Sequence, residues 1–258
     1  MTIETNNQTP LAAIILAAGK GTRMNSDLPK VLHPVSQKPM VQWVVDAVVE
    51  AGVGRTLLVV GHGADEVKRQ IPNCEFVLQE PQLGTGHAVD VCRETLANFE
   101  GDILILGGDG PLIRAQTITQ MVEKQKETQA SATLATSTIP DPTGYGRIVR
   151  DTNDRFSAIV EHKNATPEQL DIHEVYPSYA IFNAASLWSC LDNLEKNPVS
   201  NEYYLTEVPA MMLARGEKVE IVNAVPPEDI LSINTPQQLA EVEAMLQARL
   251  DTTLESTS

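Results

Sequence analysis

Largely apolar runs that each end at a glycine constrain the fold of this chain more than any other feature. The runs occupy residues 12–18, 56–60 and 102–106, and they stop at Gly19, Gly61 and Gly107. They do not alternate between apolar and polar residues, which is typical of strands covered on both faces in a parallel sheet. The sequence therefore predicts buried parallel strands with a flexible turn after each one.

Segments with apolar residues at helical spacing separate these runs, at 39–51, 64–70, 86–97 and 117–129. Two further strands are predicted at 74–78 and 132–138. Strands that alternate with helices across short connections predict an α/β fold, with a Rossmann-like, mostly parallel sheet flanked by helices on both faces. Ligands of such sheets bind at the carboxyl ends of the strands, so the three glycine turns should meet at one edge.

The second half of the chain is less regular. Short strands are predicted at 147–149, 157–161, 179–182 and 219–223, and helices at 185–194, 202–214 and 235–249. The change near residue 140 predicts a smaller subregion laid over the sheet. We expect a single domain over 11–250, with a flexible leader at 1–10 and a flexible tail at 251–258.

The net charge and the distribution of apolar residues limit the classes of binding partner and the cellular compartment that we expect. The net charge is −15 and the pI is near 4.7, which excludes nucleic acid and anionic membranes as expected partners because phosphate groups select basic surfaces. No apolar run approaches the roughly 20 residues that span a bilayer, and the polar start of the chain is not a signal peptide. Three scattered cysteines indicate reduced thiols, so the sequence predicts a cytoplasmic protein.

The strongest motif is the segment 16–24, L-A-A-G-K-G-T-R-M, which is followed by D-L-P-K-V-L at 27–32. Backbone N–H groups around Gly19 can cradle phosphate at the end of a strand, and Arg23 and Lys30 add positive charge. The motif is not a Walker loop, because no Gly-Lys-Ser/Thr follows a four-residue gap. It is not the dinucleotide fingerprint either, because Met24 stands at the third glycine position. The alternative is a glycine-rich turn with a solvated lysine and arginine.

Two further segments place oxygen ligands near that turn. Asp109 lies in G-G-D-G-P-L at 107–112, and a carboxylate there is well placed to hold Mg²⁺ on phosphate oxygens. Its alternative role is that of a turn-forming aspartate. Asn234 follows the largely apolar residues 230–233 and is the second candidate ligand. Its alternative role is structural: either Asn234 or Thr235 would be the N-cap of a helix that has Pro236 at its first position.

Two loops offer groups that suit a nucleoside and a sugar. The segment 79–88, Q-E-P-Q-L-G-T-G-H-A, has amide side chains and glycine N–H groups that could read the edge of a nucleobase. A plain helix start at Thr85 is its alternative. The segment 141–147, D-P-T-G-Y-G-R, together with Glu161 suits sugar hydroxyls, although a hairpin turn would also explain it.

Taken together, these segments resemble the sugar-1-phosphate nucleotidyltransferases, and most closely the pyrophosphorylase (uridyltransferase) domain of N-acetylglucosamine-1-phosphate uridyltransferase. The resemblance extends from about Ala12 to Leu246 and includes the later segments V-E-H-K and E-Y-Y-L-T-E. It implies a fold of the nucleotide-diphospho-sugar transferase type. It also implies a nucleotide half at about 11–139 and a sugar-binding half at about 140–234.

The resemblance implies a role for each matching residue. Arg23, Lys30 and Asp109 are similar to the catalytic groups, and Asp109 and Asn234 to the Mg²⁺ ligands. The groups that would bind UTP are Leu16, Ala17, Ala18, Gly19, Gln79, Gln82, Gly84, Thr85, Gly107 and Gly108. The groups that would bind or border the sugar are Gly146, Glu161, Tyr176, Tyr204 and Thr206.

The activity implied is the Mg²⁺-dependent transfer of a uridylyl group from UTP to N-acetylglucosamine 1-phosphate, in nucleotide-sugar biosynthesis for the cell wall. A homo-oligomer is compatible with it. Three departures concern the substrates: Tyr176-Pro177-Ser178 replaces N-T-G, Gly107 replaces a frequent Tyr, and Gly110 replaces a usual Val. Two alternatives therefore remain, namely another sugar 1-phosphate or nucleotide, and a weakly catalytic regulatory protein that binds nucleotide sugars.

Overall fold

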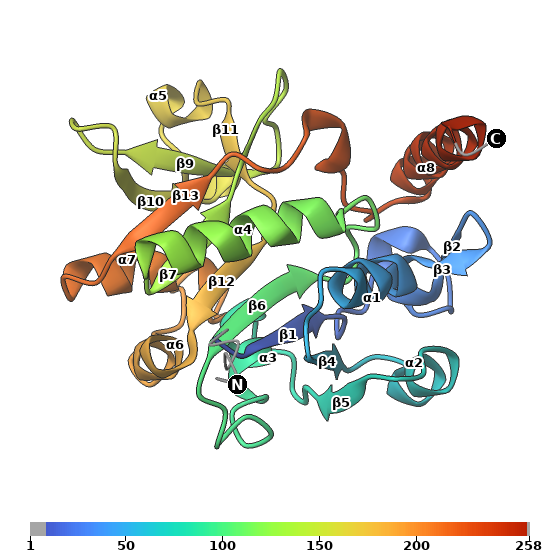
Figure 1. The fold of residues 1–258 in the computed structure, drawn as a ribbon, viewed down its shortest axis with the longest axis horizontal. Coiled ribbons are helices and arrows are strands. Elements are labelled where there is room, and N and C mark those ends of the chain that lie inside the picture. Colours follow the sequence, from blue (N-terminus) through green and yellow to red (C-terminus); the bar gives the residue numbers. More distant parts are fainter. Residues whose placement is uncertain (1–8, 257–258) are drawn as a thin grey trace, which may run out of the picture.

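The computed structural model describes residues 9–256, and its centre is a seven-stranded sheet in the order β13-β7-β12-β6-β1-β4-β5 (Figure 1). Its strands are β1 (Leu11–Leu16), β4 (Arg55–Val60), β5 (Glu75–Leu78), β6 (Asp102–Gly107), β7 (Ala132–Ala135), β12 (Ala180–Asn183) and β13 (Val219–Val222). Neighbouring strands are parallel except around β12, which pairs antiparallel with β6 and β7. The predicted mostly parallel α/β sheet is confirmed.

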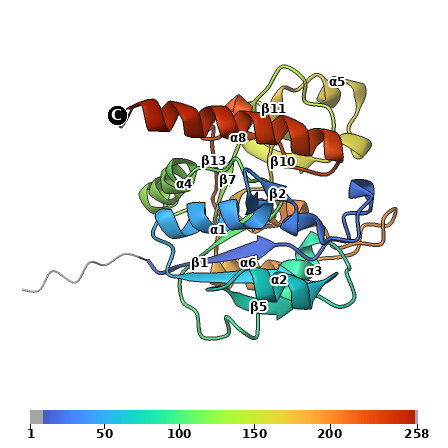
Figure 2. The same ribbon diagram turned by 90° about the vertical axis from the view of Figure 1, so that its right-hand side faces the viewer.

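Helices cover both faces of this sheet because its strands are apolar on both sides. In β1, Ala13 and Ile15 belong to one core cluster, and Ala12 and Ile14 belong to the other. The first face carries α1 (Met40–Glu50), α2 (Ala64–Gln70) and α4 (Ala115–Thr128), with α8 (Pro236–Ser256) outside them (Figure 2). The opposite face carries α3 (Thr85–Asp90), α6 (Ala184–Leu191) and α7 (Val208–Ala214).

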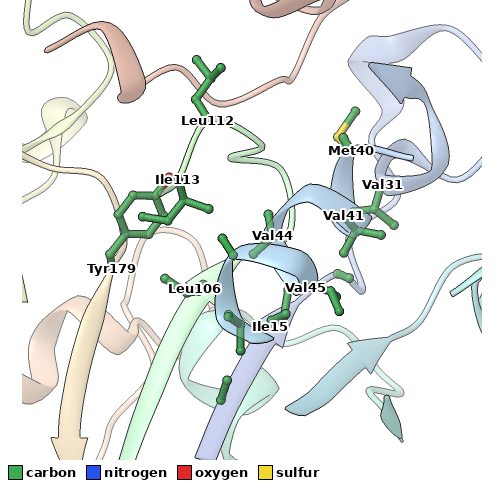
Figure 3. Close-up of a cluster of buried hydrophobic side chains, with 14 of the residues drawn as sticks. Ile15, Val31, Met40, Val41, Val44, Val45, Leu106, Leu112, Ile113 and Tyr179 are labelled. Atoms are coloured by element: carbon green, nitrogen blue, oxygen red, sulfur yellow. The ribbon is translucent and has the colours of Figure 1, made fainter. Parts of the chain in front are cut away.

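Helix α1 shows how local sequence and core packing agree. Val41, Val44 and Val45 of α1 are buried in the same core cluster as Ile15 of β1 and Leu106 of β6 (Figure 3), and burial of such a side chain contributes about 1.5–3 kcal/mol. The helix ends where Gly52 adopts a left-handed conformation, with φ of 78°. The N–H of Gly52 donates to Val49 and that of Val53 to Val48, which is the Schellman pattern of helix termination.

A second, antiparallel sheet in the order β10-β9-β11-β8 forms the predicted smaller subregion. Its strands are β8 (Ser137–Thr138), β9 (Gly146–Arg150), β10 (Phe156–Val160) and β11 (Glu174–Tyr176), while β2 (Pro34–Val35) and β3 (Lys38–Pro39) form a small hairpin. The single strand predicted at 132–138 is wrong, because the chain changes sheet at Thr136. There the Thr136 N–H donates to Val222 and its hydroxyl donates to Glu174, 2.9 Å away in each case.

Two predicted helices are too long. Helix α3 ends at Asp90 instead of residue 97, because the N–H groups of Cys92 and Arg93 donate to carbonyls three rather than four positions back, and turns follow through residue 98. Helix α7 begins at Val208 instead of residue 202. The backbone of Tyr203 pairs instead with the segment between β5 and the start of α3, since its N–H donates to Leu83 and its carbonyl accepts from Gly86.

Helix α8 is longer than the 235–249 predicted, and it includes residues 251–256 of the expected flexible tail. The physical reason lies in the contacts of residues 249 and 250. Leu250 packs against the core of this face, and Arg249 donates to the Leu112 carbonyl at 3.1 Å. Residues 1–8, most of the predicted leader, and residues 257–258 lie outside the described residues.

The turns that follow the parallel strands meet at one edge of the sheet, as predicted. The N–H of Gly108 donates to Leu16, that of Ala17 to Val59 and that of His62 to Ala18. These bonds extend the pairing of β1 with both of its neighbours beyond the strand ends. Between residues 9 and 256, no helix is long and apolar enough to cross a membrane.

Candidate active site

Two cationic and two oxygen-bearing side chains converge at this edge. The Lys30 ammonium lies 2.6 Å from Oδ2 of Asp109 and 3.0 Å from Oδ1 of Asn234. The Arg23 guanidinium also donates to Oδ1 of Asn234, at 3.0 Å. Lys30 and Asp109 are largely shielded from water, with side chains 13% and 26% exposed, so their charges interact more strongly than at the open surface. The structure therefore brings the predicted catalytic and metal-ligating residues together.

Close packing around the turn after β6 sets the position of Asp109. A Cβ at Gly107 would lie 2.7 Å from Oδ1 of Asp109, so a side chain there would displace the carboxylate. A Cβ at Gly110 would overlap the hydroxyl oxygen of Tyr179, which fills that volume and is itself buried. The Ile233 N–H donates to the Asp109 carbonyl at 2.8 Å, which anchors the segment before α8 to this turn.

Asn234 is available to the site because another residue caps α8. The Thr235 hydroxyl accepts from the N–H of Gln238 at 3.2 Å, so Thr235 performs the capping role. Gln238 in turn accepts from the N–H of Asn234 at 2.9 Å, and the Asn234 amide donates to Ser232. The sequence interpretation left the cap open between Asn234 and Thr235. It missed Gln238, although a glutamine three residues after a threonine cap is a recognisable signal.

A cleft of about 320 Å³ connects these groups with the predicted sugar residues. Its lining is Arg23, Asp109, Thr143, Gly144, Tyr145, Gly146, Glu161, Tyr176, Pro177, Ser178, Ile230, Ser232, Asn234 and Gln238. Gly146 pairs with Tyr176 across β9 and β11, and a Cβ at Gly146 would lie 2.9 Å from Ile159. Gly146, Glu161 and Tyr176 thus share one cavity with the predicted metal ligands, whereas Tyr204 and Thr206 do not line it.

Tyr176 forms a buried wall of this cleft, with only 6% of the residue exposed. Burial raises the pKa of its phenol, and the nearby charge of Glu161 raises it further, so the ring is neutral at physiological pH. Ser178, two residues later, adopts a left-handed conformation with φ of 68°. The backbone therefore retains a turn that favours glycine, while the side chain at residue 176 is far larger than an asparagine.

Two of the residues predicted to bind UTP, Gln79 and Gln82, line a separate hollow of about 470 Å³. Its other lining residues are Lys20, Gly61, His62, Leu78, Glu80 and Pro81. The Gln82 amide donates to the Ala18 carbonyl at 2.5 Å, and the Gln79 amide to the Gly84 carbonyl at 3.0 Å. A Cβ at Gly61 would lie 2.7 Å from the Gln82 nitrogen. These contacts join the turn after β1 to the loop after β5.

The side chains of Thr85, Thr206 and Tyr204 line neither cavity. The Thr85 hydroxyl accepts from the Leu205 N–H at 3.0 Å, and Thr206 donates to Glu161 at 3.2 Å. The Tyr204 hydroxyl accepts from Lys163. The backbone groups of Leu16, Ala17 and Gly108 are already hydrogen-bonded beside the sheet, because Gly108 donates to Leu16 and Ala17 donates to Val59. Gly19, in contrast, is exposed. The sequence interpretation also gave no role to Tyr145 and Ser232, which line the cleft.

The family described as the MobA-like NTP transferase domain matches residues 13–170, more than half of the chain. The chain belongs to this family. It is therefore a nucleotidyltransferase by family, and the resemblance described above is confirmed. The matched residues include the turn that contains Arg23, the turn that contains Asp109 and half of the residues that line the cleft.

Relatives of known sequence and structure agree with this placement. The chain is 43% identical over 240 residues to the bifunctional protein GlmU of Bacillus cereus (strain G9842) and of Bacillus anthracis (strain CDC 684 / NRRL 3495). The match covers 93% of this chain and 52% of each relative, so the chain spans about half their length. A crystal structure of UDP-glucose pyrophosphorylase complexed with UDP-glucose has the same fold, with a TM-score of 0.74, 17% identity, and 93% and 99% of the two chains covered.

Proposed function

We propose that this nucleotidyltransferase transfers a uridylyl group from UTP to N-acetylglucosamine 1-phosphate, with release of pyrophosphate. The observation that carries the proposal is that one cleft is lined by Arg23, Asp109, Gly146 and Glu161. The Lys30 ammonium donates to Asp109 at the edge of this cleft. The 43% identity to the bifunctional protein GlmU supports it. The hollow lined by glutamine amides supports a nucleobase site beside that cleft.

The residues at the centre of the site fit a magnesium ion. Asp109 and Asn234 direct one carboxylate and one amide oxygen at the same cation, which is the Lys30 ammonium. Oxygen ligands of this kind are those that Mg²⁺ prefers, and it commonly takes few from the protein and the rest from phosphates and water. Within residues 9–256 no cluster of three or more His, Cys, Asp or Glu side chains could hold a metal, which agrees with such a two-ligand site.

The proposed chemistry is an in-line displacement at the α-phosphorus of UTP by a phosphate oxygen of the sugar phosphate. The nucleophile is already an anion, so the protein supplies no general base. Lys30 and Arg23 would turn from Asp109 and Asn234 to the phosphate oxygens and stabilise the charge that develops on the leaving pyrophosphate. A bound Mg²⁺ would add Lewis-acid stabilisation of the phosphoryl oxygens. The cleft contributes by holding the two substrates in position.

One observation favours a second candidate for the sugar. Tyr176 pairs with Gly146 across β9 and β11. At the position of Tyr176 the resemblance implies an asparagine that would bond the sugar. Pro177 offers no backbone N–H in compensation. A sugar without the acetamido group, such as glucose 1-phosphate, is therefore the alternative acceptor.

The test is a matrix of nucleoside triphosphates against sugar 1-phosphates, read by pyrophosphate release with Mg²⁺ and with a chelator. We expect the highest rate for UTP with N-acetylglucosamine 1-phosphate and none with the chelator. A strong preference for glucose 1-phosphate would overturn the amino-sugar assignment. Binding of UDP-sugars without pyrophosphate release in any combination would instead identify a regulatory protein.

A further inference from the structure

Arg147 in β9 is a buried charged side chain to which the reaction proposed above assigns no role. Only 1% of the residue is exposed, and among residues 9–256 no carboxylate lies within ion-pair distance of it. Its guanidinium donates to the Tyr145 carbonyl and to Nδ1 of His162 at 3.3 Å, while its Nε has no partner among the described residues. The Asp141 carboxylate attracts the guanidinium only from a distance. A buried charge without a directly bonded counter-charge is costly, so its retention calls for a physical reason.

The contacts of His162 point to that reason. Nδ1 of the His162 ring faces the N–H of Gly144 at 3.2 Å as well as the Arg147 guanidinium. Both partners can only donate, so Nδ1 must accept, and the ring is neutral with its proton on Nε2. Arg147 and His162 therefore hold the same turn from two sides, through the carbonyl of Tyr145 and the N–H of Gly144.

The turn that they hold is one wall of the cleft. Thr143, Gly144, Tyr145 and Gly146 all line it, and Gly144 adopts a left-handed conformation with φ of 86°. Gly146 and Glu161, the proposed sugar contacts, directly precede Arg147 and His162 in the chain. Neither Arg147 nor His162 lines the cleft, so both act from behind its wall.

We propose that Arg147 and His162 are positioning residues that hold the turn 142–146 in the shape that binds the sugar 1-phosphate. The proposal rests on the proposed function. It restricts their effect to the sugar substrate, because the hollow assigned to the nucleobase is lined by residues from other segments of the chain. Their loss should weaken binding of the sugar phosphate and leave UTP binding unchanged.

Substrate selectivity separates this role from a merely structural one. Arg147→Met leaves the Tyr145 carbonyl and Nδ1 of His162 without their donor, and buried acceptors that lose a partner are destabilising. The melting temperature should therefore fall, and the KM for the sugar 1-phosphate should rise at least about ten-fold while UTP binding stays unchanged, because small misplacements in a binding wall are costly. A merely structural arginine would instead change both KM values together.

The experiment compares Arg147→Met, His162→Leu and His162→Asn, in which the asparagine oxygen can replace Nδ1 as acceptor. Pyrophosphate release is measured against each substrate, and UTP binding is measured separately by calorimetry. We expect a raised sugar-phosphate KM in the first two variants, unchanged UTP binding in all three, and substantial rescue in His162→Asn. Arg155→Met, which removes an exposed arginine of the same hairpin, is the matched control.

Amide hydrogen exchange gives a second readout that needs no activity. The Gly144 amide and its neighbours should exchange at least about ten-fold faster in Arg147→Met and His162→Leu than in the parent or in Arg155→Met. Unchanged exchange and an unchanged sugar-phosphate KM would overturn the positioning role. If the parent protein uses no sugar phosphate but the exchange result holds, the proposed function fails while the holding of this turn stands.

Discussion

Replacement of Gly110 by alanine is the sharpest test of how the site is built. The backbone at Gly110 is not in the left-handed region, so alanine meets no conformational barrier there. The added Cβ would instead overlap the hydroxyl oxygen of Tyr179. Tyr179 is 2% exposed and packs beside Ile113 in the core (Figure 3), so its ring has little room to withdraw. The strain must then move the turn that carries Asp109.

The expected loss of stability in Gly110→Ala follows from overpacking, and the expected loss of turnover follows from the proximity of Asp109. Overpacking typically costs about 1–3 kcal/mol, which corresponds to a fall in melting temperature of roughly 2–4 °C per kcal/mol for a domain of this size. A shift of the Asp109 carboxylate by about 1 Å should lower turnover about 100-fold. Thermal unfolding and pyrophosphate release measure the two effects separately.

A double variant identifies the cause. In Gly110→Ala/Tyr179→Phe the hydroxyl is gone, and the nearest remaining ring atom, Cζ, lies 3.5 Å from the new Cβ, an ordinary contact. Activity and stability should therefore recover in large part. Gly54→Ala is the control, because its Cβ would meet only the Leu11 carbonyl at 3.9 Å. Parent-like behaviour of Gly110→Ala, or a double variant as impaired as the single one, would refute the reasoning.

Three further predictions concern the centre of the site and the sugar. Asp109→Asn should fold normally but lose orders of magnitude in Mg²⁺-dependent pyrophosphate release, since the proposed pair of Mg²⁺ ligands would then carry no negative charge. Near-normal activity would reduce Asp109 to a turn residue. Lys30→Ala and Arg23→Ala should each cost about 2–4 kcal/mol of transition-state stabilisation, seen as lower turnover with an unchanged melting temperature. Equal rates would show that the pair does not contact the phosphates in the reaction. Tyr176→Asn should shift a competition between N-acetylglucosamine 1-phosphate and glucose 1-phosphate toward the amino sugar, since an unpaired polar group costs about 1–3 kcal/mol. No change in selectivity would remove Tyr176 from the sugar site.

The local pattern of the sequence was enough to predict the sheet and the place of its turns. Apolar runs and the glycines after them depend on short-range rules of burial and conformation, and they correctly predicted β1, β4 and β6 with their turns at one edge. The same rules placed Asp109 at a strand end. They could not choose between a turn and a metal ligand, because that choice depends on which distant side chain faces the carboxylate.

Contacts across the tertiary structure decided the rest. Lys30 and Asn234 are 204 positions apart. Their side chains come within 3.0 Å only because the segment before α8 returns to the turn after β6, where the Ile233 N–H donates to Asp109. The strand predicted at 132–138 divides at Thr136 because its first part, β7, pairs within the seven-stranded sheet and its second part, β8, pairs within the four-stranded sheet. Periodicity reports how a segment is buried but not what covers it. For that reason the roles of Thr235 as the cap, of Tyr179 beside Gly110 and of Arg147 behind the cleft emerge only from the folded chain.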